Sequence, residues 1–209
     1  MKYNIIFLLI LISLNGCINI KSDYPDIKYY ELSQPEQAKL DIYKTDGLLL
    51  IRDVNIESGS YGSQIIVNWD KKRVQKYFYH RWIDDIDLLI RDFFVARINN
   101  SGLFTKGVEK TIRSVIPDYM LDISILDFYI ESQSDNNNIS FVNIELSIKL
   151  VKVGTGLTEN EFILNKTYKN RTIRPDNSVE NIALASSKSL ANICDDLIVD
   201  ISNSIINKK

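Results

Sequence analysis

The side chain with the clearest chemical potential in this sequence is the thiol of Cys17, because of the residues before it. Lys2 precedes a run from Ile5 to Leu14 in which only Ser13 is polar, and Asn15-Gly16 separates that run from the cysteine. A thiol after a small residue, with an aliphatic residue three positions earlier, is typical of diacylglycerol transfer in bacteria. We therefore predict that residues 1–16 are a signal peptide and that Cys17 carries covalent lipid. An unmodified cysteine after an ordinary signal peptide is the alternative.

The apolar run before Cys17 is too short to remain as a membrane span. Its ten residues would cover roughly 15 Å as a helix, about half of a bilayer core. Acyl chains such as palmitate each contribute about 0.8 kcal/mol per buried CH₂ group, so two or three chains hold a protein firmly. We expect residues 17–27 to be the lipidated cysteine and a tether. Because Ile18 and not Asp follows Cys17, we expect the periplasmic face of the outer membrane, with the inner membrane as the alternative.

Residues that commonly catalyse reactions are scarce in the rest of the chain. His80 is the only histidine, and its place at a predicted strand-to-helix junction is more typical of a packing or surface residue than of a base. Cys194 lies in a helical pattern, which favours a buried and inert thiol. The segment from Gly59 to Gly62 lacks the lysine and the spacing of a phosphate-binding loop. We therefore expect no enzyme activity, no metal and no cofactor other than the lipid on Cys17.

Composition limits the partners of the chain. The whole sequence has 25 basic and 27 acidic residues and a formal net charge of −2. No block of like charge is present, so we expect no binding to nucleic acid. The predicted mature part is long enough for one domain, which we place at residues 28–209.

Two long helices are predicted from the spacing of apolar residues. The first follows Trp82 and ends at Ser101-Gly102, and its acidic residues Asp84, Asp85 and Asp87 suit a helix amino terminus without any catalytic role. The second follows Pro175, with Asn177 or Ser178 as its cap. Its apolar positions are Leu190, Ile193, Leu197, Ile201 and Ile205.

Alternating and β-branched segments predict the strands. The apolar run of residues 47–56 predicts a buried strand, and the segments 65–67 and 74–79 predict a hairpin. Residues 144–150 alternate strictly between apolar and polar, which predicts a strand with one face in water, and residues 161–173 are polar enough for an edge. The prediction is a mixed α/β (α+β) fold. Its sheet has five to six mostly antiparallel strands, and both helices pack mainly on one face.

An unusual concentration of aromatic residues lies just before the first predicted helix. Core packing and cross-strand pairs explain most of it, and an exposed surface for a lipid tail or a partner protein is the alternative. The residues are Tyr61, Trp69, Tyr77, Phe78, Tyr79 and Trp82.

The order of these features resembles the ABC-type transport auxiliary lipoprotein family, which is MCE-associated and paraquat-inducible protein C-like. The matching elements are Cys17, the arm Lys28-Tyr29-Tyr30-Glu31-Leu32, the strand from Leu48 to Val54, Tyr61 with Ile65, and Trp82 at the start of a long helix. The resemblance covers nearly all of the mature chain. It implies that residues 28–209 form one auxiliary lipoprotein domain, and that Tyr30, Leu32, Tyr61 and Trp82 contact a partner.

The resemblance implies a non-catalytic subunit of an envelope lipid-transport system. Its partners would be an MCE-domain protein that bridges the periplasm and an ABC transporter permease complex, and it would dock the bridging subunit at the membrane. It could also form a homo-oligomer. A structural lipoprotein that assists outer-membrane or cell-wall assembly is the alternative, and a periplasmic hydrolase that uses His80 and the acidic trio is a third class.

Overall fold

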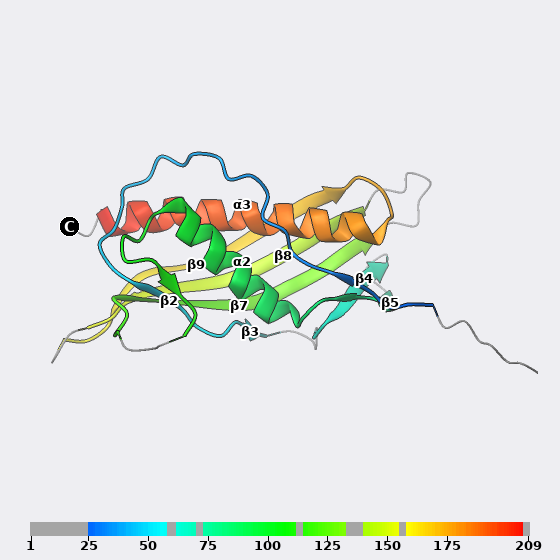
Figure 1. The fold of residues 1–209 in the computed structure, drawn as a ribbon, viewed down its shortest axis with the longest axis horizontal. Coiled ribbons are helices and arrows are strands. Elements are labelled where there is room, and N and C mark those ends of the chain that lie inside the picture. The colour runs from blue at the N-terminus through cyan, green and yellow to red at the C-terminus, as the bar shows by residue number, and fades with distance from the viewer. Residues whose placement is uncertain are drawn as a thin grey trace, which may run out of the picture.

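The computed structural model describes residues 25–57, 62–69, 73–111, 115–132, 140–154 and 158–206. The predicted signal peptide, Cys17 and Tyr61 lie outside these residues. Within them the chain forms one sheet and two helices, as Figure 1 shows. The strands are β1 (Lys28–Tyr30), β2 (Leu49–Ile51), β3 (Asn55–Ile56), β4 (Gln64–Trp69), β5 (Arg73–Trp82), β6 (Val108–Glu109), β7 (Tyr119–Ser132), β8 (Ser140–Lys152) and β9 (Glu161–Arg174), and the helices are α2 (Ile86–Ser101) and α3 (Val179–Ile206).

The sheet is built around β7. On one side β7 pairs antiparallel with β8, and β8 pairs antiparallel with β9, which forms an edge as predicted. On the other side β2, β3 and β4 pair with β7 one after another, all parallel to it. The antiparallel hairpin of β4 and β5 follows, and β1 pairs parallel with β5 while β6 pairs parallel with β2.

The fold class is confirmed, with more strands than expected. The described residues form nine strands instead of five to six. The five long strands are β4, β5, β7, β8 and β9, while β1, β2, β3 and β6 have two or three residues each. Strands this short contain too few positions for a period of two to appear in the sequence.

Both helices cover the same face of the sheet. Along β8, Val142, Ile144, Leu146, Ile148 and Leu150 are 0–2% exposed, and the residues between them are more accessible. The buried side chains pack under α3, which lies along β8 and β9, with α2 beside it (Figure 1). The prediction of one helical face and one open face is therefore confirmed. In the described part of the chain, neither helix has the length and apolar character needed to cross a membrane.

The start of α2 differs from the prediction. Trp82 is the last residue of β5, not the opening of a helix, because it pairs with Tyr30 of β1 and its amide donates to the carbonyl of Ser63. The helix begins at Ile86, so Asp84 and Asp85 precede the helix instead of lying in its first turn. The predicted end is confirmed, since Gly102 follows α2 with a left-handed φ of 66° that glycine adopts without strain.

Candidate functional site

The face of the sheet opposite the helices carries an array of polar side chains. Because side chains alternate along a strand, the residues between the core positions point to this open face. The register places Asp122 of β7 opposite Lys149 of β8, and Ser124 opposite Ser147. Opposite charges and hydroxyl groups in such cross-strand pairs are compatible with water and with a polar partner surface.

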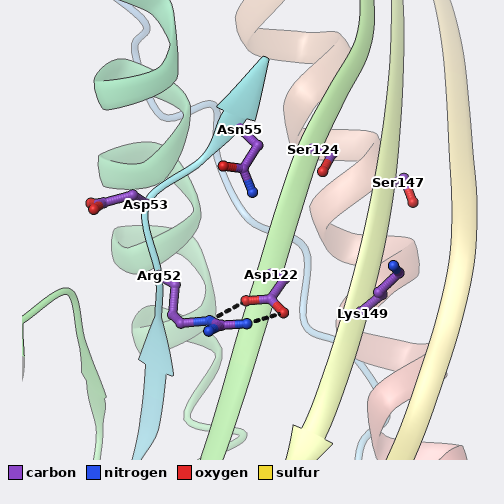
Figure 2. A pocket seen from close by; sticks show the side chains of 7 residues that line it. All are labelled: Arg52, Asp53, Asn55, Asp122, Ser124, Ser147 and Lys149. Carbon is purple, nitrogen blue, oxygen red and sulfur yellow. Dashed lines mark hydrogen bonds and ion pairs between the residues drawn. The ribbon is translucent and has the colours of Figure 1, made fainter. Parts of the chain in front are cut away.

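A hollow of about 360 Å³ lies on the open face where β2 gives way to β3. Figure 2 shows that its walls come from the β2–β3 connection, β7 and β8, with both helices behind the sheet. The hollow is lined by Arg52, Asp53, Asn55, Asp122, Ser124, Ser147 and Lys149.

An extra residue between β2 and β3 shapes this hollow. Ile51 pairs with Leu121 and Asn55 pairs with Ser124, so three residues of the β2–β3 connection face only two residues of β7. Such a bulge breaks the ladder and redirects the side chains of the bulged strand. Val54 remains in the core, with 7% of its surface exposed.

The bulge sends two consecutive charged side chains in different directions. Arg52 points across the open face and binds both carboxylate oxygens of Asp122, as Figure 2 shows. Asp53 points away from Asp122 and pairs with Arg91 of α2. The hydrogen bonds to Asp122 raise the pKa of Arg52 above its ordinary value, so this guanidinium is always charged. Because 54% of the Arg52 side chain is exposed, the pair contributes about 1 kcal/mol or less to stability.

The groups that line the hollow are charged side chains, a side-chain amide and two serine hydroxyls. Ser124 and Ser147 lack a neighbouring histidine, since His80 lies on β5 outside the hollow. Activation of a serine nucleophile needs such a base within hydrogen-bond reach. Within the described ranges, no group of three or more His, Cys, Asp and Glu residues could hold a metal ion. The hollow instead presents a fixed set of charges and hydrogen-bonding groups.

Tyr30, one of the predicted partner contacts, ties β1 to β5 and α3. Its hydroxyl lies 2.8 Å from Nδ1 of His80 and donates to Oε1 of Glu180 at 3.3 Å. Burial, and next the Glu180 carboxylate, raise the pKa of Tyr30 above its ordinary value. The hydroxyl is therefore protonated at neutral pH, and the arrangement is a structural link between three elements.

The other predicted contacts have different surroundings. Leu32 is partly buried against the core. Trp82 is 1% exposed and packs edge to face on Phe128, with 6.0 Å between the ring centroids. The side chain of Trp82 therefore lies in the core, and not on a surface where a partner could contact it as predicted. Tyr61 lies outside the described residues.

The aromatic concentration divides between core and surface. Trp82 is buried, Tyr77 is half-buried, and Phe78 and Tyr79 are 80% and 45% exposed. The core interpretation and the surface interpretation therefore each describe part of the group. The side chain of Trp69 lies outside the described part.

Sequence reasoning missed a polar contact that holds the arm of residues 31–45 on the helices. Arg97 of α2 is 3% exposed and makes two hydrogen bonds to the carboxylate of Asp195 on α3, at 2.8 and 2.7 Å. Its third nitrogen donates to the carbonyl of Pro35 at 3.0 Å, and Gln34 donates to the carbonyl of Phe93 at 2.8 Å. The signal was available in the sequence, because Arg97 occupies a core-facing helical position where a charge needs a partner.

Comparison with known proteins shows the fold. No family model matches the sequence, and no curated protein matches it. Among solved structures, protein XCC0632 from Xanthomonas campestris, of family model DUF330, is 18% identical and has a TM-score of 0.72, with 87% of this chain and 98% of that chain covered. The likeness therefore extends over most of this chain.

Two further solved structures share this arrangement. One, described as an uncharacterized protein, is 13% identical with a TM-score of 0.59 and covers 86% of this chain and 99% of its own. The other is hypothetical protein CT253 from Chlamydia trachomatis, 7% identical with a TM-score of 0.51, with 76% of this chain and 99% of that chain covered. At such identities the shared property is the fold, and function must be argued from sites.

Proposed function

We propose that this chain is a lipid-anchored envelope lipoprotein that serves as a non-catalytic auxiliary subunit of an ABC/MCE-type lipid-transport system. The arrangement of residues before Cys17 supports the anchor. The resemblance of the arm around Tyr30 and Leu32 and of the strand order supports the role in transport. In this role the domain docks the periplasm-spanning subunit and holds it near the membrane.

The observation that carries the proposal is the position at which the chain enters the domain. Figure 1 shows β5 at the end of the sheet away from the carboxyl end of α3, and β1, which begins three residues after residue 25, pairs with β5. Pro25 follows Cys17 by eight residues, which span at most about 26 Å at roughly 3.3 Å per residue. Lipid on Cys17 would therefore hold the β1–β5 end close to the bilayer and leave the open face of the sheet accessible from the periplasm.

The hollow on the open face is the proposed docking surface. Its ion pair between Arg52 and Asp122 and the neighbouring Lys149 supply charges of both signs at fixed positions. Complementary charges on a partner contribute to specificity and to the rate of encounter. The opposite face offers less, because α2 and α3 already cover it.

The direct test is copurification combined with site-specific crosslinking. The tagged full-length chain is isolated from envelopes and probed for MCE-domain and permease subunits. A photoreactive residue at Lys149, on the open face, should crosslink to the MCE-domain subunit. The same residue at Lys188, exposed on the outer side of α3, is the matched control and should give no crosslink. Absence of both subunits from the purified material, or equal crosslinking from both positions, would contradict the proposal.

A further inference from the structure

Exposed apolar side chains gather on β1, on β5 and beside them. Six of the thirteen large apolar side chains that are exposed among the described residues lie between residues 27 and 83 on these two strands or next to them. We call these six the tether-side patch. They are Ile27 (41% exposed), Tyr29 (58%), Val74 (64%), Phe78 (80%), Tyr79 (45%) and Ile83 (59%).

The local structure of β5 explains the exposure of two of these side chains. Its end at His80 to Trp82 pairs with β1, and the register of its pairing with β4 shifts between Lys76, which faces Ile66, and Arg81, which faces Gln64. Such an irregularity leaves residues between the paired segments outside the regular ladder. Phe78 and Tyr79 lie in this interval. Exposed apolar side chains on neighbouring strands are candidates for a site that contacts another molecule or a membrane.

The length of the preceding chain identifies the neighbour of this patch. Ile27 and Tyr29 belong to the patch and follow Cys17 by only ten and twelve residues. Acyl chains on Cys17 would keep them within about 40 Å of the bilayer even with a fully extended tether at roughly 3.3 Å per residue. The opposite end of the sheet is about 43 Å farther along β8, at 3.3 Å for each of its 13 residues. The bilayer is therefore the one large apolar partner that the anchor brings to this end of the domain.

The composition of the patch suits the boundary between lipid headgroups and acyl chains. Tyrosine combines an apolar ring with a polar hydroxyl and is enriched at that boundary. Lys28 and Lys76 are exposed beside the patch, and neither takes part in an ion pair among the described residues. Their ammonium groups can bind lipid phosphates.

We infer that the tether-side patch inserts into the interfacial region of the bilayer, so that the domain rests on the membrane through β1 and β5 as well as through its lipid. This inference rests on the anchor proposed for Cys17. The contact fixes the orientation of the domain, because attachment through Cys17 alone would let it rotate. The open face of the sheet then has a defined direction relative to the membrane, which assists docking of a periplasm-spanning subunit.

The test measures lipid contact at one residue of the patch and at one matched residue far from it. The full-length chain, purified from envelopes with its acyl chains, carries either Phe78→Cys or Ile116→Cys labelled with an environment-sensitive fluorophore. These positions are 80% and 79% exposed, and Ile116 precedes β7 at the opposite end of the sheet. Cys194 is 0% exposed and should resist labelling in the folded protein.

Each labelled protein is reconstituted into vesicles of phosphatidylethanolamine and phosphatidylglycerol, with and without lipids that carry a shallow nitroxide quencher. The expected result is a blue shift and several-fold quenching at residue 78 and neither at residue 116. Equal responses at the two positions overturn the inference. A blue shift at residue 78 without vesicles, which indicates a second copy, or one that requires the MCE-domain subunit, also overturns it.

The same preparations separate this inference from the proposed function. Loss of the response at residue 78 while the MCE-domain subunit still copurifies overturns the membrane contact alone. Retention of the response while no transport subunit copurifies overturns the proposed role in transport alone.

Discussion

Two buried arginines show how differently a guanidinium can be accommodated in this protein. Arg97 has a carboxylate and a carbonyl as partners, as described above. Arg174 is 4% exposed, and its Nη2 donates to Oδ1 of Asn177 at 2.5 Å, while its Nε and Nη1 have no hydrogen-bond partner among the described residues. Burial lowers the pKa of Arg174 below its ordinary value, and Tyr77 and Asp176 partly oppose this shift. Arg97 pairs with a carboxylate, so it is the arginine that we expect to stabilise the packing of α2 on α3.

Replacement of Arg97 by methionine should lower the free energy of unfolding by about 3 kcal/mol, because it leaves the partly buried Asp195 carboxylate without its partner. The variant also loses the contact to the carbonyl of Pro35 that holds the arm on the helices. Urea unfolding of the full-length chain measures the difference. The double variant Arg97→Met with Asp195→Leu should recover much of the loss, because both charges are then removed.

Lys188→Ala is the matched control for this prediction, since Lys188 is exposed on the same helix as Asp195. It should change the free energy of unfolding by about 0.5 kcal/mol or less. If Arg97→Met is as stable as this control, the buried pair contributes nothing measurable and the prediction is wrong.

At the scale of elements, the amino terminus of α3 is fixed by side chains just before it. Oγ of Ser178 accepts a hydrogen bond from the amide of Asn181 at 3.3 Å, so the predicted cap at Ser178 is confirmed. Asp176 accepts hydrogen bonds from the amide of Ser178 at 2.8 Å and from the side-chain amide of Asn181 at 2.7 Å. These contacts satisfy donors that would otherwise lack partners at the start of the helix.

The hydrogen bonds to Asp176 predict a specific pH dependence. They lower the pKa of Asp176 to about 2, below the value of about 3.9 for an unfolded carboxyl group. The stabilisation is therefore fully present above about pH 3.9 and is lost as the pH falls through about 2. Asp176→Asn should be less stable than the parent at about pH 7, and the difference should shrink below about pH 3.9 and vanish only below about pH 2, as thermal unfolding at several pH values can measure.

Asp41→Asn removes the same charge from an exposed site on the arm and serves as the control for Asp176→Asn. At about pH 7 this variant should change the free energy of unfolding by about 0.5 kcal/mol or less. A stability difference for Asp176→Asn that persists at the acid end would show that the carboxylate charge is not responsible for it.

At the scale of the whole molecule, the proposed function depends on where the anchor lies relative to the sheet. The sheet is long and has one covered and one open face. The end at which the domain is attached to the membrane therefore decides which surface a partner can reach. The arm of residues 31–45 runs from this end over α3 toward β2 (Figure 1). The backbone amides of Ser33 and Tyr43 donate hydrogen bonds to the hydroxyls of Ser187 and Ser202 on α3. The attachment point is therefore tied to the body of the domain at several positions.

Cys17→Ala in the full-length chain should abolish lipid attachment and move the protein from the membrane fraction to other fractions on envelope fractionation. The expected change is a nearly complete loss, because the tether-side patch alone lacks the affinity of two or three acyl chains. Mass spectrometry of the parent amino terminus provides the control and should show acyl mass on Cys17. A variant that remains membrane-bound as tightly as the parent would contradict the anchor.

The sequence alone was sufficient to predict the class of fold and its two-faced sheet. Strict alternation from Ile144 to Leu150 specified one buried and one open side, because a strand repeats every two residues whatever it pairs with. The recurrence of Leu190, Ile193 and Leu197 specified α3 for the equivalent reason in a helix. Ser178 and Gly102 marked helix ends, since their roles depend on local backbone geometry.

Only the tertiary structure determined which residues meet across the chain. It placed Trp82 in the core by pairing β5 with β1, joined Arg97 to Asp195, and opened the hollow at Arg52 through one extra residue opposite β7. It also brought the exposed apolar residues of β1 next to those of β5 by pairing the two strands. Local sequence patterns record the periodicity of an element, whereas register, bulges and long-range contacts depend on which segments pair, and no single segment contains that information.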